Sequence, residues 1–228
     1  MKDIKLMIFD LDGTLADTLD GITQGINLTL AEAGYPTHTR EDVLAFVNYG
    51  TRQYIEEALP KEVRGDVDLV TRLMESYIRH YATTYTQSQV YDGITEVLAR
   101  LDGDYLLAVN SNKQDEFVKV LTRQLFPEGL FVAAEGFRDD RPAKPDPGMA
   151  YAIMEIASQK LGCTLTPDQC VYIGDSDVDY NTAKNAGMHA VSVSWGYRPH
   201  DFLKGLGSQP VCATPAELYQ ALIDLAKA

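Results

Sequence analysis

A short apolar segment that ends in paired acids constrains this chain more than any other feature. Residues 4–9 are almost all apolar, and the string Asp10-Leu11-Asp12-Gly13-Thr14-Leu15 follows them directly. A run so short, ended by acid and glycine, predicts a buried strand that leads into a loop. Ligands bind at the carboxyl ends of strands in open parallel sheets, and two acids so close repel each other unless a cation or a shared proton relieves them. The pattern therefore predicts a divalent metal site, although Asp10 and Asp12 could instead simply cap a turn.

The rest of the chain divides into an all-helical stretch and an alternating one. Helices are expected from near Thr18 to Gly34, from a capping box at 39–42, over about 51–59 and over 66–84, with a break at 48–51. Beyond residue 92, strands are expected at 105–109, 130–134, 170–173 and 190–194, with helices at 93–101, 114–125, 147–161 and 177–187 and a last helix opened by Thr214-Pro215-Ala216-Glu217. Alternating strands and helices predict an α/β fold with a parallel sheet covered on both faces. We expect a core domain of residues 1–15 and 88–228 and an inserted helical domain of residues 16–87.

Composition limits the possible partners. The chain has 228 residues, 45% of them hydrophobic, and no apolar run long enough to span a membrane. Its N-terminus shows no signal-peptide pattern, so a cytoplasmic protein without a membrane partner is expected. A formal charge of −13 repels the phosphates of nucleic acids. A small phosphorylated substrate would be repelled too, so its site must supply local positive charge.

The string from Asp10 to Leu15, placed after an N-terminal strand, resembles the first motif of the haloacid dehalogenase superfamily, whose members are mostly phosphatases. Three further segments resemble the family's other motifs: Ser111 after strand 105–109, Lys144 in the proline-fenced loop 141–147, and Gly174-Asp175-Ser176 followed by Asp179. The resemblance covers essentially the whole chain and implies a Rossmann-like core with a helical cap inserted after the first motif.

The resemblance also implies roles for these residues. Asp10 would be the nucleophile that forms an aspartyl-phosphate, and Asp12 the acid and base. Ser111 would hold a phosphoryl oxygen with the backbone N–H of Asn112, unless its hydroxyl only caps the next helix, and Lys144 would neutralise charge. Mg²⁺ would be held by Asp10, the backbone carbonyl of Asp12, and Asp175, with Asp179 as a second ligand or as a partner of one.

The substrate is less constrained. The cap loop Tyr49-Gly50-Thr51-Arg52 resembles the specificity loop of small-cap phosphatases, and Arg52 could grip a carboxylate or could be an ordinary surface residue. The segment 194–198 resembles the corresponding loop of phosphoglycolate phosphatases. The expected activity is hydrolysis of a small phosphorylated metabolite, similar to phosphoglycolate, by a monomer or homodimer. A β-phosphoglucomutase-like phosphotransferase, a pyrophosphatase and a non-catalytic binding protein on the same fold are the alternatives.

Overall fold

The computed structural model describes residues 3–47 and 49–227, and it divides the chain into two compact units. One unit comprises Met1–Ala16 and Val90–Ala228, and the other comprises Asp17–Gln89. Two short strands, β2 (Ala16–Asp17) and β3 (Gln89–Val90), form a separate two-stranded sheet where the chain passes from one unit to the other. Residues 16–87 were expected to contain no strand, so β2 is a difference at the start of this stretch. Asn48, in the predicted break at 48–51, lies outside the described residues.

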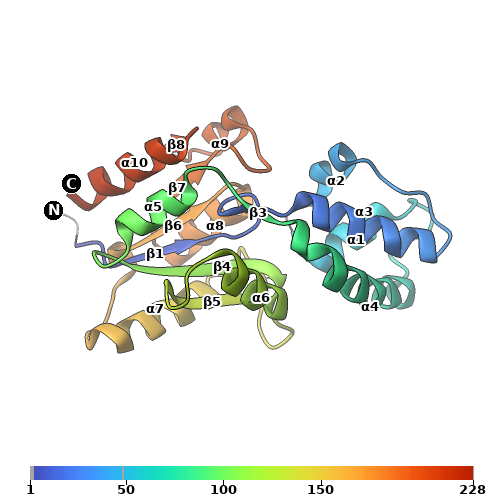
Figure 1. Cartoon of the computed structure of the whole chain (residues 1–228), viewed down its shortest axis with the longest axis horizontal. Helices are drawn as coiled ribbons and strands as arrows, with labels where there is room; N and C mark the ends of the chain where they lie inside the picture. The colour runs from blue at the N-terminus through green and yellow to red at the C-terminus, as the bar shows by residue number, and fades with distance from the viewer. Residues whose placement is uncertain (1–2, 48, 228) are drawn as a thin grey trace. The chain divides into compact units, whose positions relative to one another are not determined.

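The larger unit is built on a six-stranded sheet in the order β5-β4-β1-β6-β7-β8 (Figure 1). The strands are β1 (Leu6–Phe9), β4 (Leu106–Gln114), β5 (Phe131–Phe137), β6 (Cys170–Gly174), β7 (His189–Val193) and β8 (Val211–Cys212). Every pair of neighbouring strands is parallel. Strand β1 lies at the centre, where Leu6 pairs with Leu106 on one side and with Cys170 on the other. The α/β class and the parallel sheet predicted from the alternating pattern are confirmed.

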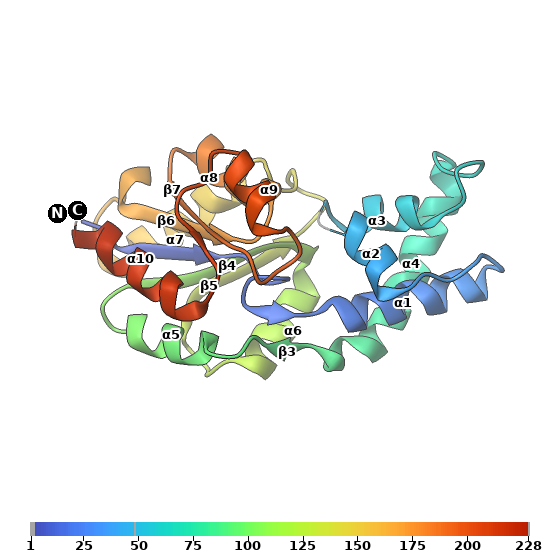
Figure 2. The same cartoon turned by 90° about the horizontal axis from the view of Figure 1, so that it is seen from above.

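Helices cover both faces of this sheet. They are α5 (Ile94–Leu101), α6 (Asp115–Leu125), α7 (Gly148–Leu161), α8 (Asp177–Ala186), α9 (His200–Gly205) and α10 (Pro215–Lys227). Figure 2 shows α7 and α8 on one side of the sheet and α5 and α6 on the other. On the α7 and α8 side, Leu6 and Ile8 of β1 are fully buried with Tyr172, Ile153 and other apolar residues. Because side chains alternate across a strand, Met7 and Phe9 face the opposite layer.

Strand β4 is longer than predicted. Its apolar part ends at Val109, as expected, but the strand continues through the polar residues 110–113 to Gln114 and pairs with β5, with an irregular register, until Phe137. Helix α9 and strand β8 were not predicted, because β8 is only two residues long and follows a polar loop. The polar end of β4 lies at the carboxyl edge of the sheet beside β1, the edge where ligands bind in open parallel sheets.

The smaller unit contains α1 (Leu19–Glu32), α2 (Arg40–Phe46), α3 (Thr51–Ala58) and α4 (Val67–Thr84). The predicted capping box is present: Asp42 N–H donates to Thr39 Oγ1 at 3.1 Å, and Thr39 N–H donates to Asp42 Oδ2 at 2.9 Å. Tyr77 and Tyr81 of α4 are buried and stack at 5.4 Å. Val70 of α4 is also buried, whereas its neighbour Leu69 is half-buried.

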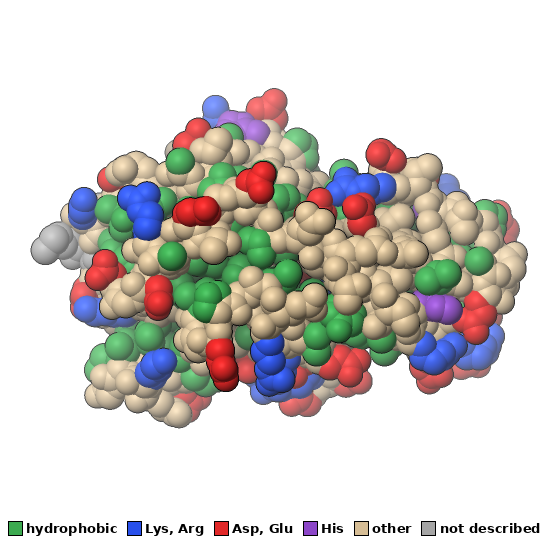
Figure 3. All heavy atoms as spheres, in the orientation of Figure 1, with side chains coloured by type: hydrophobic (Ala, Val, Ile, Leu, Met, Phe, Trp, Pro, Cys, Tyr) green, Lys and Arg blue, Asp and Glu red, His purple; other side chains and the backbone are tan. Residues whose placement is uncertain are grey.

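The surface is mixed in charge, and no helix in the described part of the chain has both the length and the apolar character of a membrane span. On the face drawn in Figure 3, Lys and Arg side chains are scattered among Asp and Glu and do not gather into one basic patch.

Candidate active site

Asp10 and Asp12 lie in the loop that leaves β1 at the carboxyl edge of the sheet. The backbone N–H of Asp10 donates to the carbonyl of Ile173 in β6 at 2.8 Å, so the loop begins in register with the sheet. Gly13 then adopts a φ of +82°, which L side chains rarely adopt, and the chain turns back so that Ala16 N–H bonds to the carbonyl of Leu11. This turn keeps both carboxylates at the edge where the strands end.

Ser111 and Lys113, in the polar end of β4, contact the carboxylate of Asp12. Ser111 Oγ donates to Asp12 Oδ2 at 3.2 Å, and Lys113 Nζ lies 3.0 Å from Asp12 Oδ1. Asn112 points the other way and binds the backbone of Lys144 twice: its side-chain oxygen accepts from Lys144 N–H at 2.8 Å, and its side-chain nitrogen donates to Lys144 O at 3.1 Å. Because side chains alternate along β4, Ser111 and Lys113 contact the loop after β1 and Asn112 contacts the loop that carries Lys144.

Lys144 is buried among oxygen atoms from three elements. Its Nζ lies 2.8 Å from Asp10 Oδ1 and 2.7 Å from Asp179 Oδ1, and it donates to the carbonyl of Asn110 at 3.1 Å. Burial lowers the pKa of this ammonium group, but the carboxylates of Asp10 and Asp179 outweigh burial and hold the pKa well above its ordinary value. Lys144 is therefore a fixed positive charge beside Asp10.

Asp10, Asp175 and Asp179 form a buried acidic cluster. One carboxylate oxygen from each lies within 4.8 Å of those of the other two. Burial raises the pKa of Asp10 well above its ordinary value, and Asp179 adds to this while Lys144 opposes it. Burial, with Asp179, also raises the pKa of Asp175 to about 7. Buried carboxylates are costly to ionise without a nearby positive charge, and their oxygens are the hard ligands that Mg²⁺ prefers. The cluster therefore fits a divalent cation such as Mg²⁺.

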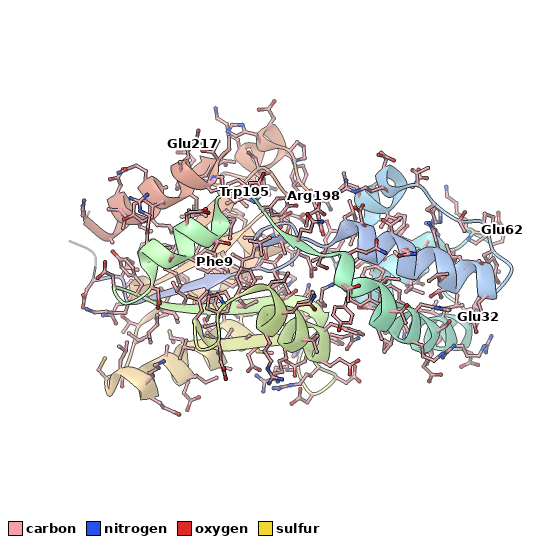
Figure 4. The ribbon with its side chains drawn as sticks, in the orientation of Figure 1. Phe9, Glu32, Glu62, Trp195, Arg198 and Glu217 are labelled. Carbon is pink, nitrogen blue, oxygen red and sulfur yellow. The ribbon has the colours of Figure 1, made fainter. Side chains whose placement is uncertain are left out.

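The segment after β7 packs directly against this cluster. Tyr197 N–H donates to Asp175 Oδ2 at 2.6 Å, and the indole N–H of Trp195 donates to the carbonyl of Thr14 at 3.1 Å. A Cβ on Gly196 would lie 2.2 Å from the carbonyl oxygen of Gly13 and 2.4 Å from Asp175 Oδ2, so only glycine fits between them. Figure 4 labels Trp195 and Arg198, which stand before and after this glycine in the chain. The loop thereby fixes Asp175 against the loop that carries Asp10 and Asp12.

The model of the haloacid dehalogenase-like hydrolase family matches residues 7–193, which contain every aspartate and lysine of the site described above. The chain belongs to this family. Curated relatives include the phosphoglycolate phosphatase of Pseudomonas syringae pv. tomato, 32% identical over 197 residues that cover 85% of this chain and 70% of the relative. The phosphoglycolate phosphatase of Aliivibrio fischeri is 31% identical over 202 residues and covers 86% of both chains.

Solved structures agree with this membership. The crystal structure of a suggested phosphoglycolate phosphatase from Lactobacillus delbrueckii subsp. bulgaricus superposes with a TM-score of 0.87 at 31% identity, over 97% of this chain and 99% of that one. A predicted phosphatase from Clostridium acetobutylicum has the same fold, with a TM-score of 0.82 at 22% identity over 97% of this chain and 99% of that one. The family predicted from the four motifs is confirmed.

The structure brings one group of predicted residues to a single edge of the hydrolase core: Asp10, Asp12, Ser111, Asn112, Lys144, Asp175 and Asp179. The side chain of Asp12 lies outside the acidic cluster and pairs with Lys113 instead. In this structure both oxygens of Asp179 bind protein groups, since Lys144 contacts one and the N–H and hydroxyl of Ser176 donate to the other.

The predicted cap residues lie in the smaller unit. Gly50 is the N-cap of α3 with a φ of +99°, and Thr51 is buried and accepts a hydrogen bond from the Tyr54 hydroxyl at 3.1 Å. Arg52 is exposed, and its guanidinium approaches Met74 Sδ at 3.9 Å. Their roles in substrate binding stay predictions.

Two site residues, Thr14 and Lys113, and one side-chain contact of Asn112 were not predicted from the sequence. Thr14 donates through its hydroxyl to Asp175 Oδ1 at 3.2 Å, Lys113 pairs with Asp12, and the Asn112 side chain anchors the Lys144 loop. A lysine two residues beyond a serine at a strand end was an available signal for Lys113. This signal can be recognised only if the predicted strand is extended past its apolar part.

Proposed function

We propose that this hydrolase is a Mg²⁺-dependent phosphatase that hydrolyses a small phosphate monoester, with phosphoglycolate as the first substrate to test. The observation that carries the proposal is the position of Asp10, a buried carboxylate at the end of β1 that touches Lys144 and lies within the acidic cluster. The curated relatives named phosphoglycolate phosphatase support the choice of substrate.

The charges around the site support a divalent cation. Four carboxylates, those of Asp10, Asp12, Asp175 and Asp179, are accompanied by the two ammonium groups of Lys113 and Lys144. Asp10, Asp175 and the backbone carbonyl of Asp12 would hold Mg²⁺, and Asp179 would orient Lys144 or act as a further ligand. When bound, the ion offsets the negative charge of the phosphoryl group.

The protein groups then divide the work. A carboxylate oxygen of Asp10 attacks phosphorus, the bond to the leaving oxygen breaks, and Asp12 gives that oxygen its proton. Lys144, Ser111 Oγ and the backbone N–H of Asn112 would bind the phosphoryl oxygens. In the second step Asp12 takes a proton from water, the water oxygen bonds to phosphorus, and Asp10 leaves as a free carboxylate with release of phosphate.

The test is phosphate release from a panel of phosphate monoesters and pyrophosphate with Mg²⁺, with EDTA, and with EDTA followed by excess Mg²⁺. We expect release that EDTA abolishes and Mg²⁺ restores, with phosphoglycolate among the best substrates. Turnover that is indifferent to EDTA would reject the metal requirement. Isomerised sugar phosphate without free phosphate would show a phosphotransferase, and preference for pyrophosphate a pyrophosphatase.

A further inference from the structure

Lys113 is a buried lysine at the site to which the mechanism above gives no task. Its ammonium group lies 3.0 Å from Asp12 Oδ1, and its side chain is only 5% exposed. We propose that Lys113 is a positioning residue that holds the carboxylate of Asp12 in the orientation in which it transfers protons. This inference rests on the proposed function, because it assigns Asp12 as the acid and base.

The geometry of β4 connects Lys113 to Asp12 in two ways. The ammonium group contacts Oδ1 directly. The backbone N–H of Lys113 donates to Ser111 Oγ at 3.1 Å, and that hydroxyl donates in turn to Asp12 Oδ2. Both oxygens of one carboxylate are thereby held from the same strand, so rotation of the carboxylate plane is restrained.

Substrate binding makes the direct contact more important. If Ser111 Oγ turns to a phosphoryl oxygen, Asp12 Oδ2 loses the hydrogen bond that the hydroxyl donates and becomes the oxygen that faces the leaving group. The Lys113 contact to Oδ1 remains. An ammonium group donates hydrogen bonds and accepts none, so it holds the carboxylate without competing for the proton that Asp12 transfers.

The two lysines of the site act on different carboxylates. Lys144 contacts Asp10 and Asp179, and Asn112 holds the backbone of its loop. Lys113 follows Asn112 in β4 and contacts Asp12. Lys113 therefore supports the proton transfer by Asp12. The loss of activity on removing Lys113 should be larger for leaving groups that need protonation.

The test compares kcat/KM of wild type and Lys113→Met on three substrates: phosphoglycolate, ethyl phosphate and p-nitrophenyl phosphate. Ethyl phosphate has an alkyl leaving group without a carboxylate, and p-nitrophenolate leaves without protonation. We expect a loss on the order of 10²-fold on both alkyl phosphates, the scale of a misplaced catalytic group, and about 3-fold or less on p-nitrophenyl phosphate. Lys119→Met is the matched control, because Lys119 also pairs with an aspartate, at 2.6 Å, but outside the site.

A double-mutant cycle tests whether Lys113 acts through Asp12. Adding Lys113→Met to Asp12→Asn should change kcat/KM little, because the group that Lys113 positions is already gone. An equal loss in both backgrounds would overturn the proposal, and so would a loss confined to phosphoglycolate, which would make Lys113 a ligand of the substrate carboxylate. If Lys113→Met does not fold, Lys113→Gln takes its place in the same cycle.

The wild-type measurements separate this inference from the proposed function. No phosphate release by the wild type from any of the three substrates would reject the phosphatase. Release by the wild type, with Lys113→Met folded and equally active on both alkyl phosphates, would reject only the positioning role.

Discussion

Lys144 and Lys113 are both buried, and each lies within 3.0 Å of an aspartate in the loop after β1, yet their surroundings differ. Lys144 joins three elements, since its ammonium group contacts Asp10 after β1, Asp179 in α8 and the carbonyl of Asn110 in β4. Lys113 acts within the edge formed by β4 and the loop after β1. The comparison teaches that one lysine holds the acidic cluster together, whereas the other orients a single carboxylate.

The largest expected effect comes from changing Asp10, a carboxylate that Lys144 contacts. Asp10→Asn should abolish phosphate release, because an amide is a poor nucleophile and a weak metal ligand, while Lys144 keeps Asp179 as a partner. Phosphate release and the thermal unfolding midpoint of the same preparation check this. A folded variant with full activity would reject Asp10 as the nucleophile.

Lys144→Met should reduce the free energy of unfolding, because Lys144 bridges two buried carboxylates. The change leaves Asp10 and Asp179 buried without their positive partner, which costs about 3–5 kcal/mol in the free energy of unfolding, measured by urea denaturation in EDTA. Added Mg²⁺ should recover part of this loss, because it supplies positive charge to the same carboxylates. A free energy equal to that of the wild type in EDTA would contradict the bridging role of Lys144.

Gly196→Ala tests how closely the loop after β7 packs against Asp175. The added methyl group would lie 2.2 Å from the carbonyl oxygen of Gly13 and 2.4 Å from Asp175 Oδ2, so one of them must move. We expect kcat/KM to fall by roughly 10- to 100-fold through misplacement of Asp175, together with weaker Mg²⁺ activation. Gly205→Ala is the control, since apart from its chain neighbours and the backbone of its own helix no atom lies within 4 Å of its added methyl group. Similar losses in both variants would show that misplacement of Asp175 is not the cause.

The smallest effect is expected at Asp115 and Lys119, a lysine and aspartate pair outside the site. Asp115 accepts hydrogen bonds from Lys119 Nζ at 2.6 Å and from Gly136 N–H at 3.0 Å, and Lys119 is 39% exposed. Burial alone would raise the pKa of Asp115, but Lys119 and Gly136 outweigh it and lower the pKa below its ordinary value. The folded state therefore gains stability from this carboxylate above the unfolded-state pKa and loses it as pH falls through the folded-state pKa.

Asp115→Asn should accordingly reduce the free energy of unfolding by about 0.5–1 kcal/mol near neutral pH. The difference from the wild type should shrink toward the acid end of a series of urea denaturations between pH 7 and pH 3, because the folded-state pKa of Asp115 is lowered. A difference that is constant over this range would show that packing, and not the charge of Asp115, causes it.

Much of the fold could be predicted from local sequence. Apart from α9 and the short strands β2, β3 and β8, the helices and strands of both units lie close to their predicted positions, because each has an apolar period of its own or a cap such as the Thr39 and Asp42 box. The polar end of β4 was missed, since residues 110–113 show no apolar alternation and hydrophobic periodicity is the signal on which the strand assignment depends.

The candidate site divides in the same way. The sequence by itself singled out the candidate reactive groups, because Asp10, Lys144 and Asp175 stand in short motifs at strand ends and in a proline-fenced loop. Only the tertiary structure decided which groups are partners. Lys113 meets Asp12 across about a hundred residues, and Asn112 meets the Lys144 backbone, because buried polar atoms need partners and β4 continues beside the loop after β1.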